Sequence, residues 1–168
     1  HGVRAVSGDC GFLALHQRKL AARLEIPVFL SSLLQIPFIS SILGPERKVG
    51  IITADSRSLD ETLLEAVGVE PGENLVIRGM EDRPGFSKAV IEETGALDSD
   101  EIEKEAVYVA RGMVEDEPKV GALLLECSCL PPYGMPIQKA VGLPVFDYVT
   151  MINYVHSALV KKGFTGQM

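Results

Sequence analysis

Cysteines, metal-binding motifs and cofactor motifs are scarce in this sequence, and each shortage argues against a class of protein. The chain has three cysteines, an odd count that does not favour a disulfide framework. We therefore expect a reducing, cytoplasmic setting. The sequence has no His, Cys and carboxylate cluster at zinc spacing, no glycine-rich phosphate loop and no lysine in a Schiff-base context. We expect neither a metal nor an organic cofactor.

Basic patches and long apolar runs are also missing. The 16 Lys and Arg residues are scattered among 23 Asp and Glu residues, and the net charge is -7, so a nucleic-acid partner is not expected. The longest uncharged stretch, 26–43, is interrupted by prolines and serines, whereas a membrane-spanning helix needs about 20 predominantly apolar residues. We therefore expect no membrane partner.

Strand and helix patterns alternate along the whole chain, which is typical of a parallel sheet with helices on both faces. Apolar runs predict strands at 2–10, 26–30, 48–53, 74–77, 120–125 and 143–146. Helical periodicity, bounded by capping and stop residues, predicts helices at 12–24, 33–43, 59–67, 83–95, 98–115, 133–141 and 147–160.

The segment Gly44-Pro45-Glu46 is the best domain boundary, because it separates a completed helix from a new strand. We expect the chain to return from the second lobe to the first near Asp147. The first lobe would then comprise 1–45 and 147–168, and the second lobe 46–146. The chain opens directly in a strand pattern, so we expect the first lobe to be incomplete at its N-terminus.

Two cysteines, Cys10 and Cys127, share a local context. Each ends an apolar run, follows an acidic residue and precedes a helical pattern. The carboxyl ends of parallel strands form the ligand crevice of such sheets, and a helix N-terminus lowers a thiol pKa. We therefore predict two catalytic thiols facing one cleft. The alternative is packing, since free cysteine is often buried. Cys129 is expected to pack beneath the loop or to stay a spare thiol.

These residues resemble the aspartate/glutamate racemase superfamily, which includes hydantoin racemases, maleate isomerases and arylmalonate decarboxylases. The resemblance rests on four segments, Ser7 to Ala14, Val49 to Asp55, Leu124 to Tyr133 and Gly142 to Asp147. It implies two pseudo-symmetric α/β lobes with the active site in the cleft between them, and one catalytic cysteine from each lobe. A homodimer is also expected.

The resemblance favours a cofactor-independent amino-acid racemase that acts on a small acidic substrate of the aspartate or glutamate type. Cys10 and Cys127 would transfer protons on opposite faces of Cα, as an acid and a base of suitable pKa. The alternatives are a maleate isomerase, an arylmalonate decarboxylase-like enzyme, or a non-catalytic protein that uses its thiols for binding or redox sensing. Departures from the racemase pattern, at Gly11, Phe12, Glu126 and Cys129, suggest a different substrate.

Several polar positions are candidates for binding the substrate carboxylate. Gly11 stands where the racemases have a residue that holds it, and four hydroxyl residues lie at predicted strand ends or helix starts: Ser31, Ser32, Thr53 and Ser128. The alternative for each hydroxyl is simple helix capping. Asp9 and Glu126 are possible helpers of the adjacent thiols, although neighbours on a strand point to opposite faces.

Overall fold

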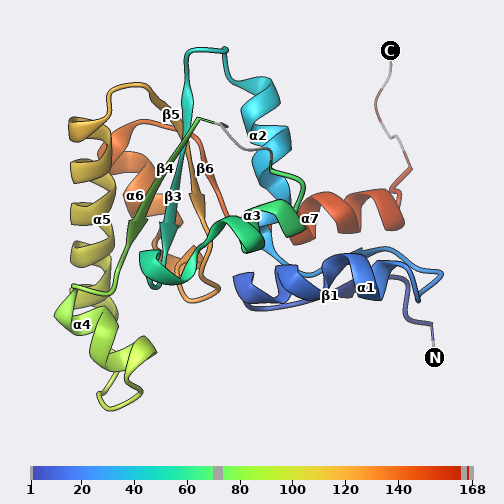
Figure 1. Ribbon diagram of the computed structural model, residues 1–168, viewed down its shortest axis with the longest axis horizontal. Helices are drawn as coiled ribbons and strands as arrows, with labels where there is room; N and C mark the ends of the chain where they lie inside the picture. The colour runs from blue at the N-terminus through green and yellow to red at the C-terminus, as the bar shows by residue number, and fades with distance from the viewer. Residues whose placement is uncertain (1, 70–73, 164–165, 167–168) are drawn as a thin grey trace.

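The computed structural model describes residues 2–69, 74–163 and 166. Its strands form two parallel sheets (Figure 1). In the smaller sheet β1 (Val6–Ser7) pairs with β2 (Val28–Phe29). The larger sheet has the order β4-β3-β5-β6, with strands Leu75–Gly79, Lys48–Thr53, Val120–Leu125 and Val145–Phe146. The α/β class with parallel sheets, predicted from the alternating pattern, is confirmed.

The two central strands, β3 and β5, have the bounds that the sequence predicted. β3 pairs with β4 on one side and with β5 on the other, so successive side chains alternate between two covered faces. One face packs its apolar side chains against α5 (Ser99–Asp116) and α6 (Gly134–Val141). The other face packs against α2 (Ile36–Ile42) and α3 (Glu61–Ala66). Helices therefore cover both faces of the sheet.

The first strand and helix are shorter than predicted. The expected strand at 2–10 is reduced to β1, because its partner in the described structure, β2, spans only two residues. The expected helix at 12–24 divides into a 3-10 turn, Gly11–His16, and the short α1, Gln17–Ala21. A second 3-10 turn, Ser32–Gln35, precedes α2.

The predicted helix at 83–95 is also broken. It begins as α4 (Pro84–Phe86) and continues as a π-helical segment, Ser87–Ile91. Glu93 has a positive φ of 53°, and the N–H groups that follow it turn back to the carbonyl of Lys88. This left-handed residue ends the helix, because a non-glycine residue with positive φ cannot continue it.

The last strand leads into α7 (Tyr148–Leu159), which lies beside α2 and the smaller sheet (Figure 1). Gln35 donates a hydrogen bond to the carbonyl of Asp147, at 2.9 Å. This contact joins the start of α7 to the segment before α2. The division into lobes 1–45 plus 147–168 and 46–146 stays a prediction, and residues 1, 70–73, 164–165 and 167–168 of these ranges lie outside the described structure.

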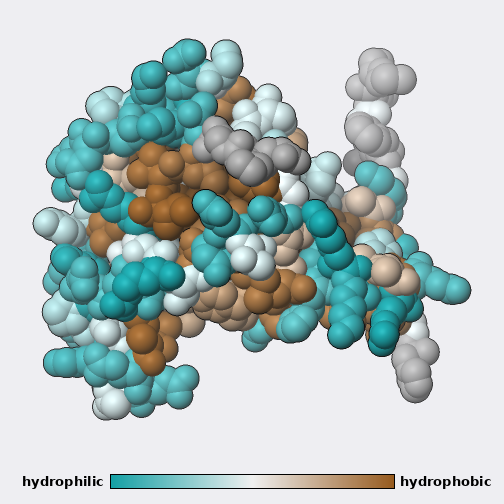
Figure 2. Space-filling model, viewed as in Figure 1, coloured by the Kyte–Doolittle hydropathy of each residue, from teal (hydrophilic) through white to brown (hydrophobic). Residues whose placement is uncertain are grey.

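β4 is an edge strand, and all of its residues are half-buried. Apolar surface is visible over this edge in Figure 2, with hydrophilic residues around it. Among the described residues, none of the helices has both the length and the apolar character that crossing a membrane requires.

Candidate active site

The candidate site begins where β3 and β5 end. These strands are neighbours and parallel, so their carboxyl ends lie at the same edge of the sheet. Thr53 is the last residue of β3, and Glu126 directly follows β5. The Thr53 hydroxyl donates a hydrogen bond to Glu126 Oε2 at 2.7 Å, and both residues are buried.

The Glu126 carboxyl group accepts further hydrogen bonds from the backbone N–H groups of Ala54 and Gly11. Burial raises the pKa of Glu126, while these donors and the Thr53 hydroxyl oppose that rise. If β5 continued through position 126, the Glu126 side chain would face away from Cys127, because neighbours on a strand point to opposite faces. Instead the chain has already left β5 at this residue, and the side chain turns inward between the two strand ends and Gly11.

Gly11 fits this contact because it has no side chain. A Cβ at this position would overlap the carboxyl oxygen of Glu126. Gly11 is the first residue of the 3-10 turn that follows Cys10, and it is fully buried, whereas Cys10 itself is exposed. The close approach therefore places the residue after Cys10 against the residue before Cys127.

The buried serines before α2 complete this polar region. Ser32 donates from its hydroxyl to the backbone carbonyl of Glu126 at 3.1 Å. The Ser31 hydroxyl accepts a hydrogen bond from the N–H of Leu33 and caps the following turn. The structure thus brings Gly11, Ser32, Thr53 and Glu126 together, with their polar groups engaged inside the protein, while Ser31 lies beside them as a cap. Their role in binding substrate stays a prediction.

Cys127 follows the buried strand β5 and is half-buried. Burial raises its pKa to about 12, and the nearby Cys129 and the charge of Glu126 contribute to the rise. The prediction of a lowered thiol pKa is therefore wrong for this residue. The physical reason is that α6 begins only at Gly134, so the thiol is separated from the helix N-terminus and is desolvated instead.

The remaining predicted positions are at the surface. Asp9, Cys10, Ser128 and Cys129 are all exposed. Of the two expectations for Cys129, packing beneath the loop does not fit its exposure, and a spare thiol stays a prediction. In the described part of the chain, no three His, Cys, Asp or Glu side chains gather in a way that could hold a metal ion.

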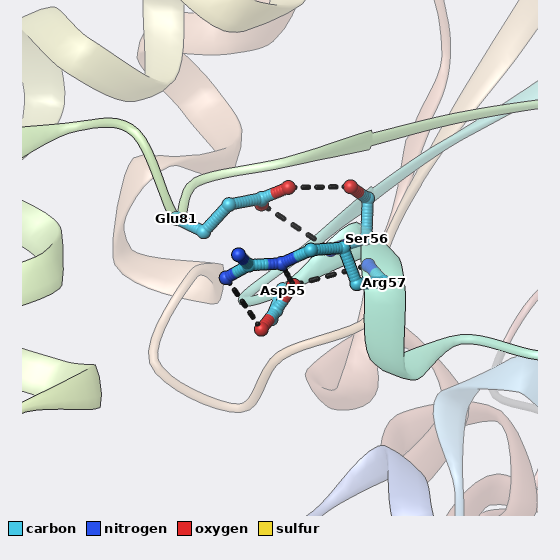
Figure 3. Close-up of polar contacts among 4 residues, drawn as sticks. All are labelled: Asp55, Ser56, Arg57 and Glu81. Carbon is cyan, nitrogen blue, oxygen red and sulfur yellow. Dashed lines mark hydrogen bonds and ion pairs between the residues drawn. The ribbon is translucent and has the colours of Figure 1, made fainter.

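A second polar cluster, which the sequence analysis missed, lies next to the ends of β3 and β4 (Figure 3). Glu81 accepts hydrogen bonds from both the N–H and the hydroxyl of Ser56. Asp55 forms an ion pair with Arg57, with 2.8 Å between Oδ1 and Nε, and caps the turn that begins at Ser56. The signal available in the sequence was Ala54-Asp55-Ser56 at a strand end, which is a typical capping pattern.

The sequence is similar to several curated lyases. It is 32% identical over 167 residues to dimethylsulfoniopropionate lyase 3 of Emiliania huxleyi (strain CCMP1516), covering 95% of this chain and 43% of that protein. It is 31% identical over 163 residues to lyase 5 of the same strain, covering 94% of this chain and 32% of that protein. The dimethylsulfoniopropionate lyase of Durusdinium sp. clade D is 31% identical over 157 residues, covering 91% and 52%. The chain thus spans about a third to a half of these relatives.

These similarities overturn the predicted activity. The sequence relatives carry the name of a lyase rather than that of an amino-acid racemase, so the racemase prediction is wrong. The alternatives drawn from the same superfamily, a maleate isomerase or an arylmalonate decarboxylase, are no better supported. No protein-family model matches the sequence.

Solved structures define the fold. A Gly74Cys mutant of arylmalonate decarboxylase matches 99% of this chain and 71% of its own, with a TM-score of 0.62 and 17% identity. Allantoin racemase from Pseudomonas fluorescens matches 96% and 63%, with a TM-score of 0.60 and 18% identity. Glutamate racemase RacE1 from Bacillus anthracis matches 95% and 61%, with a TM-score of 0.57 and 14% identity. The chain therefore has the fold of the aspartate/glutamate racemase superfamily, as its motifs predicted.

Proposed function

We propose that this protein is a lyase that cleaves dimethylsulfoniopropionate. The observation that supports the proposal is sequence similarity to dimethylsulfoniopropionate lyases at 31 to 32% identity, over more than nine tenths of the chain. The chain spans only part of these relatives, so lyase activity is a proposal for this protein.

Dimethylsulfoniopropionate, the compound in the names of these relatives, carries a sulfonium group two carbons away from its carboxylate. A base removes a proton from the carbon next to the carboxylate, and the electron pair of that C–H bond forms the new C=C bond. The C–S bond breaks, and its electrons leave with the sulfur. The products are dimethyl sulfide, acrylate and a proton on the base, so neither an oxidant nor a cofactor is required.

A base on one face of the substrate is enough for this elimination, in contrast to a two-base racemisation. We assign the base to Cys127. Its thiol is half-buried and directly follows the buried Glu126 at the end of β5, whereas the Cys10 thiol is exposed. Burial raises the Cys127 pKa to about 12, so its thiolate has to form in the substrate complex, where the positive charge of the sulfonium group favours the charged thiolate. Cys10, which is exposed next to the start of the 3-10 turn, would then assist substrate binding without being the base.

The proposal is tested by incubating the purified protein with dimethylsulfoniopropionate and measuring dimethyl sulfide by gas chromatography and acrylate by NMR. We expect equal amounts of both products. Cys127→Ser should lower kcat by about 100-fold or more, the usual contribution of a general base. Ser41→Ala, at an exposed position of α2, is the control and should keep activity within about threefold, since surface substitutions have small effects.

If Cys127→Ser releases dimethyl sulfide at the parent rate, Cys127 is not the base. If the parent itself gives neither product, the proposal of a lyase is wrong.

A further inference from the structure

Glu126 lies between three segments that are far apart in the sequence. Its carboxyl group accepts hydrogen bonds from the Thr53 hydroxyl, at 2.7 Å, and from the N–H groups of Ala54 and Gly11. Its own N–H donates to the carbonyl of Ile52 at 2.8 Å, and its carbonyl accepts from Ser32. The residue is only 3% exposed. Every polar group of Glu126 therefore has a partner.

The contact with Gly11 is the one that links the two thiols. Gly11 follows Cys10 directly, and Glu126 precedes Cys127 directly. No Cβ can be added to Gly11 without overlap with the Glu126 carboxyl group, so the fit is tight from both sides. The path from Cys10 to Cys127 thus runs through one hydrogen bond between residues that are 115 positions apart.

We propose that Glu126 is a positioning residue, which ties the turn that carries Cys10 to the strand end that carries Cys127. The catalytic consequence of this inference rests on the proposed function. The contact between Glu126 and Gly11 is a property of the fold and does not depend on it. A glutamate reaches Gly11 from the end of β5, whereas an aspartate is one methylene too short. A glutamine has the same reach, and its amide oxygen can face Gly11 while its NH2 group faces the Thr53 hydroxyl, which can also accept a hydrogen bond.

A role limited to stability makes different predictions. In that case the loss of Glu126 would lower the melting temperature, and the folded variant would turn over substrate at the parent rate. A positioning role lowers kcat in the folded protein, because a displacement of about 1 Å of a reacting group can cost about 100-fold in rate. A role limited to the negative charge of Glu126 would be restored by aspartate and not by glutamine.

The first measurement does not depend on turnover. Hydrogen exchange of the Gly11 amide is followed by NMR or by mass spectrometry of a peptide that covers residues 8–14. Glu126→Asp should raise the exchange rate about tenfold or more, because the shorter side chain withdraws the acceptor from the Gly11 amide, whereas Glu126→Gln should raise it less. The matched control is Glu81→Gln, which removes the carboxylate that binds Ser56 at the neighbouring strand end and should leave Gly11 exchange unchanged.

The second measurement uses release of dimethyl sulfide, with kcat and KM normalised to folded protein. Glu126→Asp should lower kcat by at least about tenfold and change KM by less than about threefold, since a positioning loss acts on the reacting geometry. Glu126→Gln should lower kcat less than Glu126→Asp. Glu81→Gln should retain the parent values.

Unchanged Gly11 exchange in Glu126→Asp would overturn the proposal. So would faster exchange with an unchanged kcat, which would make the contact structural only, or full activity in Glu126→Asp. If the parent does not cleave the substrate, the proposed function has failed on its own. The positioning role of Glu126 is then tested by Gly11 exchange and by the alkylation rate of the half-buried Cys127. Loss of the contact between Glu126 and Gly11 should raise that alkylation rate about tenfold.

Discussion

At the scale of single residues, burial acts on Glu126 and Cys127 in the same direction. Both are acids that lose their charge on protonation, so removal from water raises both pKa values. They differ in their compensation. Glu126 has three hydrogen-bond donors around its carboxyl group, whereas Cys127 has the like charge of Glu126 beside it. The hydrogen bonds therefore hold the Glu126 carboxyl group in place, while the Cys127 side chain is kept as the protonated thiol at neutral pH.

The raised pKa of Cys127 predicts a distinctive reactivity. Since the pKa lies near 12, the thiolate fraction should increase about tenfold for each pH unit between 7 and 10 and should reach no plateau in that range. The measurement is the iodoacetamide alkylation rate of Cys127, resolved from Cys129 by fragment ions. Free N-acetylcysteine, which levels off near its ordinary pKa of about 8.5, is the reference. A plateau of Cys127 below pH 9 would contradict the expectation.

At the scale of elements, α7 shows how a short sequence signal sets a boundary. Asp147 accepts a hydrogen bond from the Thr150 N–H at 2.7 Å, and the Thr150 hydroxyl accepts one from the Asp147 N–H at 2.9 Å. This reciprocal capping box satisfies two backbone donors at the start of the helix. It fixes the entry of α7 beside the segment that carries Gln35.

Replacing Asp147 by alanine should lower the free energy of unfolding by about 1 kcal/mol, the usual effect of losing an N-cap. Asn153→Ala, at an exposed position inside the same helix, is the control and should change stability by less than about 0.5 kcal/mol. Urea unfolding followed by circular dichroism measures both. Equal losses in the two variants would show that the capping box contributes nothing specific.

At the scale of the whole molecule, contacts between distant segments join the two sheets. Ser32 lies in the turn between β2 and α2, and its hydroxyl binds the carbonyl of Glu126 after β5, at 3.1 Å and in a buried setting. Gln35, in the same turn, binds the carbonyl of Asp147 at 2.9 Å. The turn Ser32–Gln35 is therefore the described segment that connects the end of β5 with the start of α7.

Ser32→Ala should cost about 1 to 2 kcal/mol of unfolding free energy, because a buried carbonyl loses its donor. Ser41→Ala removes a local bond to Phe38, three residues earlier and exposed, and should cost less than about 0.5 kcal/mol. Chemical denaturation of both variants provides the measurement. A Ser32 loss no larger than that of Ser41 would mean that this link does not hold the sheets together.

The sequence by itself determined the parts that depend on local pattern. β3 and β5 were predicted at their observed bounds, because a short, nearly continuous apolar run between polar segments is typical of a strand that is covered on both faces. The motifs around Cys10 and Cys127 indicated the superfamily fold, which the solved structures confirm.

Only the tertiary structure decided the features that depend on distant neighbours. The inward turn of Glu126 needs Thr53 and Gly11 as partners, and no spacing in the sequence shows that these positions meet. The direction of the Cys127 pKa follows from burial, which the local strand-to-helix pattern does not contain. Helix 83–95 broke for a similar reason, because Glu93 adopts a left-handed conformation that helical periodicity cannot reveal. Local pattern indicated the central strands, whereas long-range packing set the contacts and the pKa shifts of the residues that follow them.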